Sequence, residues 1–308
     1  MKYSLFLTLL SCSLFLCSIS AKEGKVGPPI QGAEHLVYKE ASGSKLILNV
    51  FYPEGHDAKK DKRPAIVFFF GGGWSGGTPA QFAPHCEYLA SRGMVAMSAD
   101  YRVKSRQGTP PFECVKDGKS AVRWIRQNAK KLGIDPERLA AGGGSAGGHV
   151  VAAIASVPGF EKDEETSSVP DALLLFNPAV ILAEVPGKID MPAEKAVSLK
   201  ERIGTDPKKI SPYHHLRKGL PPTIVFHGTN DDAVPFRTVQ LYEKRAQALG
   251  NSCKLVGFED KPHGFFNWGR FGNAPFRETM LECDDFLKEL GWIRGKPTIT
   301  AFAKEQSK

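Results

Sequence analysis

The residues most able to do chemistry are Gly143-Gly144-Ser145-Ala146-Gly147, a G-x-S-x-G sequence directly after a short apolar run. A strand that ends here and turns sharply into a helix strains its serine and raises the hydroxyl above the sheet. Small residues are needed at 143 and 147 because a Cβ would collide with the adjoining strand and helix. We therefore expect Ser145 to be a nucleophile, with the Ala146 N–H aimed at the attacked group. The alternative is a Gly-rich loop that happens to contain a serine.

Three other segments place glycine or polar residues directly after expected strands. They are the glycine loop 71–74, the sequence 227–235 and the sequence 259–265. In an open parallel sheet, ligands bind at the carboxyl ends of the strands. We therefore expect a glycine loop, Ser145, an acid and a histidine to meet at one edge of the sheet.

The elements that must position these residues alternate along the chain. Strands are expected at 46–52, 65–70, 95–98, 139–141, 172–176, 223–226 and 254–258, and helices at 112–132, 238–249 and 278–290. This alternation predicts an α/β fold, with a mostly parallel, doubly wound sheet flanked by helices. Residues 181–218 break the alternation, and we expect them to form a small cap over the strand ends. Residues after Trp292 are expected to be frayed.

These motifs, together with Asp100-Tyr101-Arg102, carry a family resemblance. The chain resembles α/β-hydrolase esterases and lipases related to hormone-sensitive lipase, especially small secreted carbohydrate and feruloyl esterases. Besides the glycine loop and Ser145, the match includes His227-Gly-x-x-Asp231-x-x-Val-Pro and His263-Gly264-Phe265. It covers nearly the whole mature chain.

The resemblance implies a catalytic order of serine, acid and histidine along the chain. Of the eight histidines, His263 alone lies after Asp231. Ser145 would attack, His263 would move the proton, and Asp231 would orient His263, although the adjacent Asp232 is an alternative acid. The oxyanion would be stabilised by the backbone N–H groups of Gly72, Gly73 and Ala146.

We expect the other histidines near these motifs to have structural roles. We expect His149, one helical turn beyond Ser145, to be packed and hydrogen-bonded. His227 is expected to stabilise its turn. The pair His214-His215 is expected at the surface, and contact with substrate is its alternative. No spacing of ligands matches a metal site, so neither a metal nor another cofactor is expected.

One position departs from the family pattern. The family usually has a histidine before the glycine loop, and here Phe70 takes its place. This change puts the rigidity of the loop in doubt but leaves its backbone donors available. Trp74 is a candidate substrate contact. The segment 100–102 is expected to be structural, at the floor of the crevice.

Length and charge place limits on the class of protein. The 308 residues suffice for one α/β domain, expected at 22–308, and the net charge is +8. The basic residues are scattered, without a stripe interleaved with aromatic residues, so nucleic acid is not expected as a partner. The expected partner is a small-molecule or polysaccharide ester, and the oligomeric state stays open.

The N-terminus predicts export. Residues 1–21 combine a positive start, an apolar stretch and small residues at a cleavage site, as in a secretory signal peptide. We expect a secreted or periplasmic protein without stable membrane insertion. Lipid attachment at Cys12 is a weaker alternative.

Four cysteines remain after removal of this segment: Cys86, Cys114, Cys253 and Cys283. They allow three pairings, and the sequence does not choose among them. Cys86 and Cys114 are expected on neighbouring helices, where a disulfide is conceivable. Buried free thiols are the alternative.

The leading hypothesis is a secreted serine carboxylic-ester hydrolase that forms an acyl-enzyme and removes acyl groups from carbohydrates or other small esters. A serine exopeptidase of the prolyl-oligopeptidase type is the runner-up, but the stretch before residue 65 is too short for the usual propeller domain. A non-catalytic binding module on the same fold is a third possibility.

Overall fold

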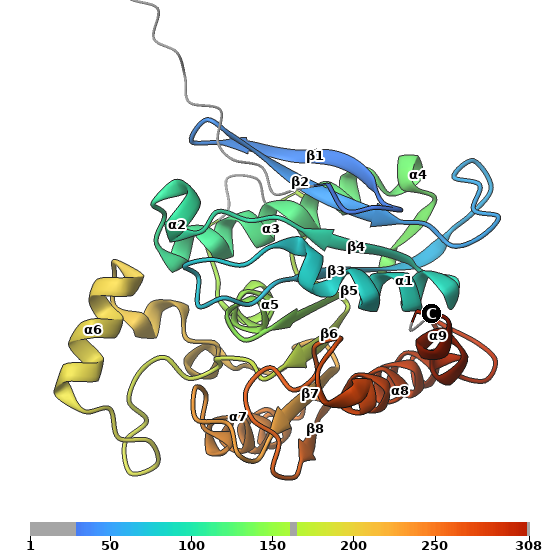
Figure 1. Cartoon of the computed structure of the whole chain (residues 1–308). Helices are drawn as coiled ribbons and strands as arrows, with labels where there is room; N and C mark the ends of the chain where they lie inside the picture. The colour runs from blue at the N-terminus through green and yellow to red at the C-terminus, as the bar shows by residue number, and fades with distance from the viewer. Residues whose placement is uncertain (1–28, 161–164, 307–308) are drawn as a thin grey trace, which may run out of the picture.

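The computed structural model describes residues 29–160 and 165–306. The expected signal peptide and Cys12 lie outside the described residues. At the centre is an eight-stranded sheet in the order β1-β2-β4-β3-β5-β6-β7-β8 (Figure 1). The strands are β1 Glu34–Ala41, β2 Ser44–Phe51, β3 Arg63–Phe69, β4 Val95–Ala99, β5 Ile134–Gly144, β6 Ala172–Phe176, β7 Thr223–Gly228 and β8 Cys253–Phe258.

The sheet is mostly parallel, as predicted. β1 and β2 form an antiparallel hairpin, and β2 pairs antiparallel with β4. The pairings from β4 through β8 are all parallel. β4 and β6 are buried at every residue, and β6 has a continuous apolar sequence. β1 was not expected, because it is a largely exposed edge strand and carries little apolar patterning.

Helices cover both faces of the sheet, which confirms the doubly wound arrangement. The longer ones are α1 Ala83–Ser91, α3 Pro111–Gln127, α5 Ala146–Ser156, α6 Ala193–Ile203, α7 Phe236–Ala248 and α8 Ala274–Glu289; the shorter ones are α2 Lys104–Gln107, α4 Ala129–Leu132 and α9 Ile299–Glu305. α1, α8 and α9 lie on one face, and α3 and α5 on the other (Figure 1). Asp284 of α8 accepts hydrogen bonds from Tyr88 and Arg92, at 2.6 Å each, and so joins α8 to α1.

Two expectations about helices need correction. The helix expected at 112–132 is interrupted at Asn128, whose backbone (φ −100°, ψ 14°) leaves the helical region. Its side chain donates to the Trp124 carbonyl at 2.8 Å, and such a local bond competes with helix continuation. The C-terminal segment is ordered rather than frayed, because Phe302 of α9 packs edge-on against Tyr88.

Residues 181–218 connect β6 to β7. They contain α6 and two short 3₁₀ helices, η2 Pro207–Ile210 and η3 Pro212–His215. An isolated antiparallel bridge joins Val185 to Ile189. Figure 1 shows α6 at the side of the molecule opposite α9.

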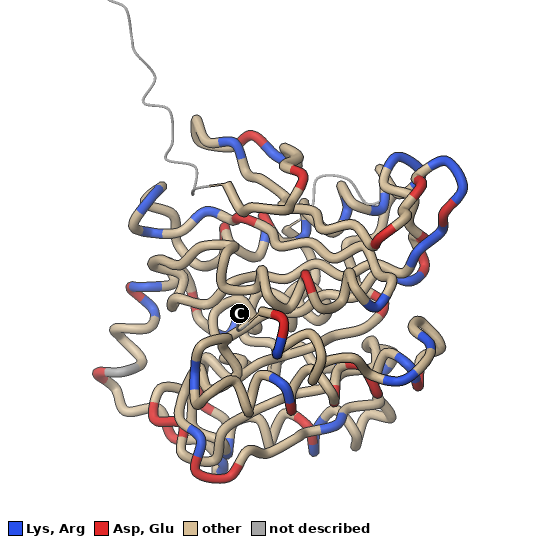
Figure 2. Tube along the Cα trace, turned by 45° about the vertical axis from the view of Figure 1, so that its right-hand side comes forward, with Lys and Arg blue, Asp and Glu red and all other residues tan. Residues whose placement is uncertain are grey.

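The four cysteines among the described residues are buried free thiols. Cys86 lies on α1 and Cys114 on α3, on opposite faces of the sheet (Figure 1). The prediction that these two cysteines lie on neighbouring helices was therefore wrong. No helix in the part of the chain that the structure describes is long and apolar enough to cross a membrane. Charges of both signs are spread along the described chain (Figure 2).

Candidate active site

Ser145 occupies a sharp turn between β5 and α5. Its backbone has φ 53° and ψ −114°, a conformation that L-residues rarely adopt. Its N–H donates to the Phe176 carbonyl at 2.9 Å, which fixes the turn against β6. A Cβ at Gly147 would lie 2.0 Å from the Phe69 carbonyl oxygen, and one at Gly143 would lie 2.6 Å from Gly147. The two flanking glycines are therefore required by close backbone contact, as the sequence indicates.

The structure brings Ser145, His263 and Asp231 together. His263 Nε2 lies 2.9 Å from Ser145 Oγ, and His263 Nδ1 lies 2.7 Å from Asp231 Oδ2. Because the carboxylate can only accept, Nδ1 carries the proton and Nε2 is free to accept from the serine hydroxyl. Asp232 is exposed, so the structure favours Asp231 over it as the orienting acid.

Asp231 is held as a carboxylate by its neighbours. The N–H groups of Ala233 and Val234 donate to Oδ1 at 3.0 and 2.8 Å. His227 Nε2 lies 3.2 Å from Oδ2 and 2.7 Å from the Val234 carbonyl, so His227 stabilises the turn as expected. Burial alone raises the pKa of Asp231, but the hydrogen bonds from His227, His263 and Val234 outweigh it and hold that pKa well below its usual range. The ionised carboxylate can stabilise a protonated His263.

The glycine loop lies against the Ser145 turn. A Cβ at Gly71 would be 3.1 Å from the Gly144 carbonyl oxygen and 3.4 Å from Ser145 Cβ. Gly72 and Gly73 have φ of 120° and 60°, which glycine adopts without strain. Among the described residues, no protein acceptor takes a hydrogen bond from the N–H groups of Gly72, Gly73 or Ala146. These donors remain available to a ligand at Ser145.

The doubt about the loop at Phe70 is resolved by other contacts. The Phe70 ring stacks on Tyr101 with centroids 4.1 Å apart, and the Tyr101 hydroxyl donates to the Phe70 carbonyl at 2.6 Å. Within the loop, the N–H groups of Ser75 and Gly76 donate to the Gly72 carbonyl. Stacking and main-chain bonds thus hold the loop without the usual histidine.

Gln81 is a positioning residue that the sequence did not indicate. Its Oε1 accepts from the Gly71 N–H at 2.6 Å, and its Nε2 donates to Asn267 Oδ1 at 2.8 Å. Asn267 in turn donates to the Gly264 carbonyl, beside His263. Gln81 therefore joins the glycine loop to the histidine loop. Such a contact across 186 residues leaves no local signal.

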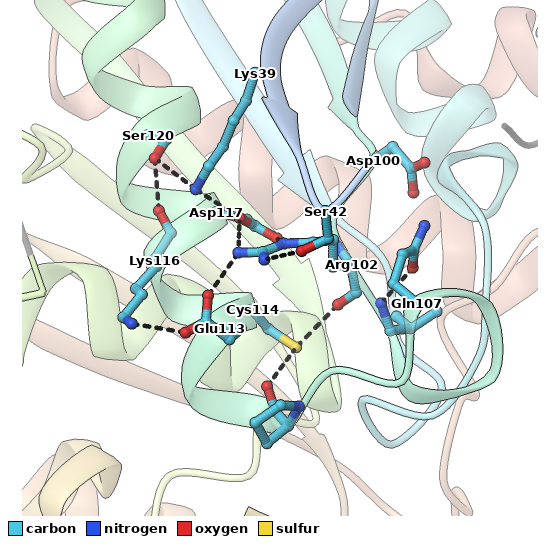
Figure 3. Close-up of polar contacts among 12 residues, drawn as sticks. Lys39, Ser42, Asp100, Arg102, Gln107, Glu113, Cys114, Lys116, Asp117 and Ser120 are labelled. Carbon is cyan, nitrogen blue, oxygen red and sulfur yellow. Dashed lines mark hydrogen bonds and ion pairs between the residues drawn. The ribbon is translucent and has the colours of Figure 1, made fainter. Parts of the chain in front are cut away.

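A buried polar network anchors the segment 100–102, in agreement with its structural interpretation (Figure 3). Arg102 donates to Asp117 from Nε at 2.8 Å and from Nη2 at 2.7 Å, and also to Glu113 at 2.7 Å. Lys39 of β1 donates to the same Asp117, at 2.7 Å. Because Asp117 of α3 binds both Arg102 and Lys39 of β1, the neighbouring Tyr101 is held in place beside the glycine loop.

Trp74 is mostly buried rather than open to a ligand, with 5% of its surface exposed. Its indole N–H donates to His149 Nδ1 at 3.1 Å, so His149 Nε2 carries the proton and donates to the Ile210 carbonyl at 2.8 Å. Burial lowers the pKa of His149 to about 4, so this ring stays neutral near neutral pH. His149 is packed and hydrogen-bonded as expected, and little of the Trp74 surface is available to a ligand.

The pair His214 and His215 binds nearby backbone instead of facing Ser145. His214 lies 3.1 Å from the Glu184 carbonyl, and His215 lies 3.0 Å from the Lys208 carbonyl. Neither lines the cavity at Ser145. In the described residues there is no group of three or more His, Cys, Asp or Glu side chains arranged to hold a metal ion.

A cavity of about 590 Å³ opens at Ser145. Residues 181–218 supply much of its wall, including Leu199 and Arg202 of α6. Arg202 also donates to the Gly73 carbonyl and lies 5.2 Å from the centroid of the Trp74 ring. Arg202 could not be identified from the sequence, because Gly73 lies 129 residues before it in the chain.

Known proteins are similar to this chain in sequence and in fold. A thermophilic esterase of the planctomycete Thermogutta terrifontis with propionate bound is 48% identical, with a TM-score of 0.82 over 87% of this chain and 98% of that one. The same esterase phosphonylated by sarin is 49% identical, with a TM-score of 0.84 over 87% and 99%. Esterase LipC of Mycobacterium tuberculosis is 29% identical over 221 residues, which are 66% of this chain and 53% of LipC.

The chain spans about half the length of the curated relatives it matches, of which LipC is one. The family model described as BD-FAE matches residues 48–245, well over half of the sequence. The chain therefore belongs to the BD-FAE family, a family of serine carboxylesterases with the α/β-hydrolase fold.

Proposed function

We propose that this protein is an exported esterase that removes short acyl groups from carbohydrates through a covalent intermediate on Ser145. The observation that carries the proposal is the continuous path of hydrogen bonds from Asp231 through His263 to Ser145, facing the free amides of the glycine loop. The signal-like sequence at residues 1–21 supports export. The propionate bound to the Thermogutta esterase supports a short acyl group.

The geometry defines the role of each group. As Ser145 Oγ attacks the ester carbonyl carbon, its proton passes to His263 Nε2, and Asp231 stabilises the imidazolium. The negative charge that develops on the carbonyl oxygen is met by the amides of Gly72, Gly73 and Ala146. His263 then protonates the leaving alcohol, and an activated water releases the acid from Ser145. Loss of one oxyanion donor costs about 3 kcal/mol of transition-state stabilisation in well-studied serine hydrolases.

The test is Ser145→Ala combined with labelling by a fluorophosphonate. We expect the variant to lose hydrolysis of p-nitrophenyl acetate by several orders of magnitude, and the probe to label Ser145 in the native protein. Ser198→Ala, which changes an exposed serine of α6, is the matched control and should keep both properties. Full activity of Ser145→Ala, or a label on another residue, would contradict the proposal.

The substrate class needs a second experiment. Acetylated and feruloylated oligosaccharides are compared with simple alkyl esters and with dipeptide amides, and release of acid or amine is measured. Faster release from the acylated sugars supports the carbohydrate assignment. Turnover of the amides without turnover of any ester would favour the peptidase alternative.

A further inference from the structure

The cavity at Ser145 carries an excess of positive charge. Three exposed cationic side chains line it, those of Lys188, Arg202 and Arg237, against one carboxylate, that of Asp190. Within the described chain, none of the three cations has a carboxylate oxygen within 4.0 Å. Their charges are therefore not neutralised by the protein itself.

Two of these cations are nevertheless held in position. Arg202 is fixed by the Gly73 carbonyl and by the face of Trp74. Arg237 Nε donates to the Lys188 carbonyl at 3.3 Å, which joins α7 to the loop that carries Lys188. Neutral partners orient a guanidinium without cancelling its charge, so a ligand meets positioned donors that remain positive.

The remainder of the cavity wall is mainly apolar. Ile181, Leu182, Met191, Leu199 and Val234 contribute to it. Apolar walls exclude water and raise the strength of charge interactions at their edge. The cavity thus combines an apolar surface beside the nucleophile with exposed cations, a pattern that fits a ligand bearing both an uncharged part and an anionic group.

We propose that the preferred substrate is an acyl ester of an anionic carbohydrate, whose carboxylate or sulfate is bound by Lys188 and Arg237. This inference rests on the proposed function. Since the acyl group proposed above is short and uncharged, the anion belongs to the alcohol, which is expelled from the ester carbonyl carbon as Ser145 becomes acylated. Carboxylate and sulfate share the recognition chemistry, because both accept charge-assisted hydrogen bonds from ammonium and guanidinium groups.

The experiment compares kcat/KM for acetylated oligogalacturonides, acetylated sulfated oligosaccharides and acetylated neutral xylo-oligosaccharides. We expect the native enzyme to prefer at least one anionic substrate over the neutral one. Exposed ion pairs contribute about 0.2–1 kcal/mol each, so the double variant Lys188→Gln/Arg237→Gln should reduce the anionic-to-neutral ratio by about two- to thirtyfold. Raising the salt concentration should reduce the native ratio in the same direction.

A control variant removes the same charge elsewhere. Lys59 precedes β3 and Lys131 lies in α4 before β5, so both are at the amino ends of the parallel strands, opposite the site. Lys59→Gln/Lys131→Gln should leave the anionic-to-neutral ratio at the native value. An equal fall in both double variants would show a general charge effect and overturn the inference.

The choice of substrates also identifies the bound anion and distinguishes a failure of this inference from a failure of the proposed function. Preference for uronate or for sulfate substrates identifies the group that is bound. Preference for half-esters of dicarboxylic acids would place the anion on the acyl side and overturn the proposal. Hydrolysis of neutral acetyl esters without any anionic preference rejects this inference alone, whereas failure on every ester rejects the proposed function as well.

Discussion

The Tyr101 hydroxyl donates to the Phe70 carbonyl at 2.6 Å, and this bond joins the segment 100–102 to the loop that carries the oxyanion donors. Both residues are fully buried, so water cannot replace the bond. Arg106 adds to the same contact, because its guanidinium pairs with Asp100 and lies over the Phe70 ring. The family pattern has a histidine at the position of Phe70, and in this chain Tyr101 and Arg106 stabilise the loop through their contacts with Phe70.

The first prediction concerns this bond. Tyr101→Phe leaves the Phe70 carbonyl buried without a donor, which costs about 1–3 kcal/mol, and lets the glycine loop move. We expect kcat for p-nitrophenyl acetate to fall about three- to thirtyfold with little change in KM.

Tyr38→Phe is the matched control for that variant. Its hydroxyl also donates to a buried carbonyl at 2.6 Å, that of Asp100, but it does not contact the glycine loop. Urea unfolding should show a similar loss of stability in both variants, with kcat reduced in Tyr101→Phe alone. Equal kcat values would show that Tyr101 acts on stability and not on the loop.

The second prediction separates the two adjacent acids. Asp231→Asn removes the charge beside His263 and disturbs the proton position on its ring, so kcat should fall by roughly 10²–10⁴-fold. Asp232→Asn changes an exposed side chain and should stay within about twofold of the native value. Steady-state kinetics on one ester checks both variants, and the reverse order of effects would exchange the roles of the two residues.

The sequence predicted those features that depend on local pattern. The apolar run of β3 and the glycines around Ser145 are visible in the sequence alone. In a parallel sheet the carboxyl ends of the strands lie at one edge, so the residues that follow these strands are brought together. Asp231 and His263 follow from this reasoning because each comes shortly after its strand. The same logic explains why β1 was missed, since an exposed edge strand need not be apolar.

Contacts between distant segments could not be predicted in this way. Gln81 reaches Gly71 and Asn267, and Arg202 reaches Gly73, through side chains that no periodicity singles out. The support of the loop at Phe70 was misjudged for the same reason. A missing histidine is visible in the sequence, whereas the stacking of Tyr101 that replaces it is a property of the folded chain.

The third prediction tests the turn at Ser145. In Gly147→Ala, the new Cβ would lie 2.0 Å from the Phe69 carbonyl oxygen and 2.4 Å from that of Phe70, both backbone atoms. α5 must shift, and Ser145 moves with it, so we expect esterase activity to fall by more than about 100-fold and stability by about 1–3 kcal/mol. Gly76→Ala is the control, because its nearest neighbour would be Ser105 Oγ at 3.9 Å. Native activity in Gly147→Ala would contradict the close packing.

The fourth prediction concerns His85 of α1, which is fully buried among aromatic rings. Phe82 and Phe276 are its closest ring neighbours, with centroids 4.7 and 4.9 Å away. Among the described residues, neither ring nitrogen has a hydrogen-bond partner. Burial lowers the pKa of His85 to about 3 from 6.5, so the folded protein keeps this ring neutral where the unfolded chain protonates it.

The sign of the effect follows from proton binding. Below about pH 6.5 the unfolded state takes up a proton that His85 in the folded state does not, so stability falls as pH decreases, until the folded ring also titrates near pH 3. The loss is about 1.4 kcal/mol per pH unit for each such group. His85→Leu removes this contribution and leaves no unpaired polar atom in the aromatic cluster, so at pH 7 it should be neutral or stabilising.

Urea unfolding between pH 4.5 and pH 7 measures the difference. The native protein should lose stability more steeply on acidification than His85→Leu, by about 1.4 kcal/mol per pH unit below pH 6. Phe82→Leu, which changes packing in the same cluster but no titratable group, is the control and should keep the native slope. If His85→Leu keeps that slope too, the buried ring is protonated in the folded state, and a proton acceptor must reach it inside the aromatic cluster.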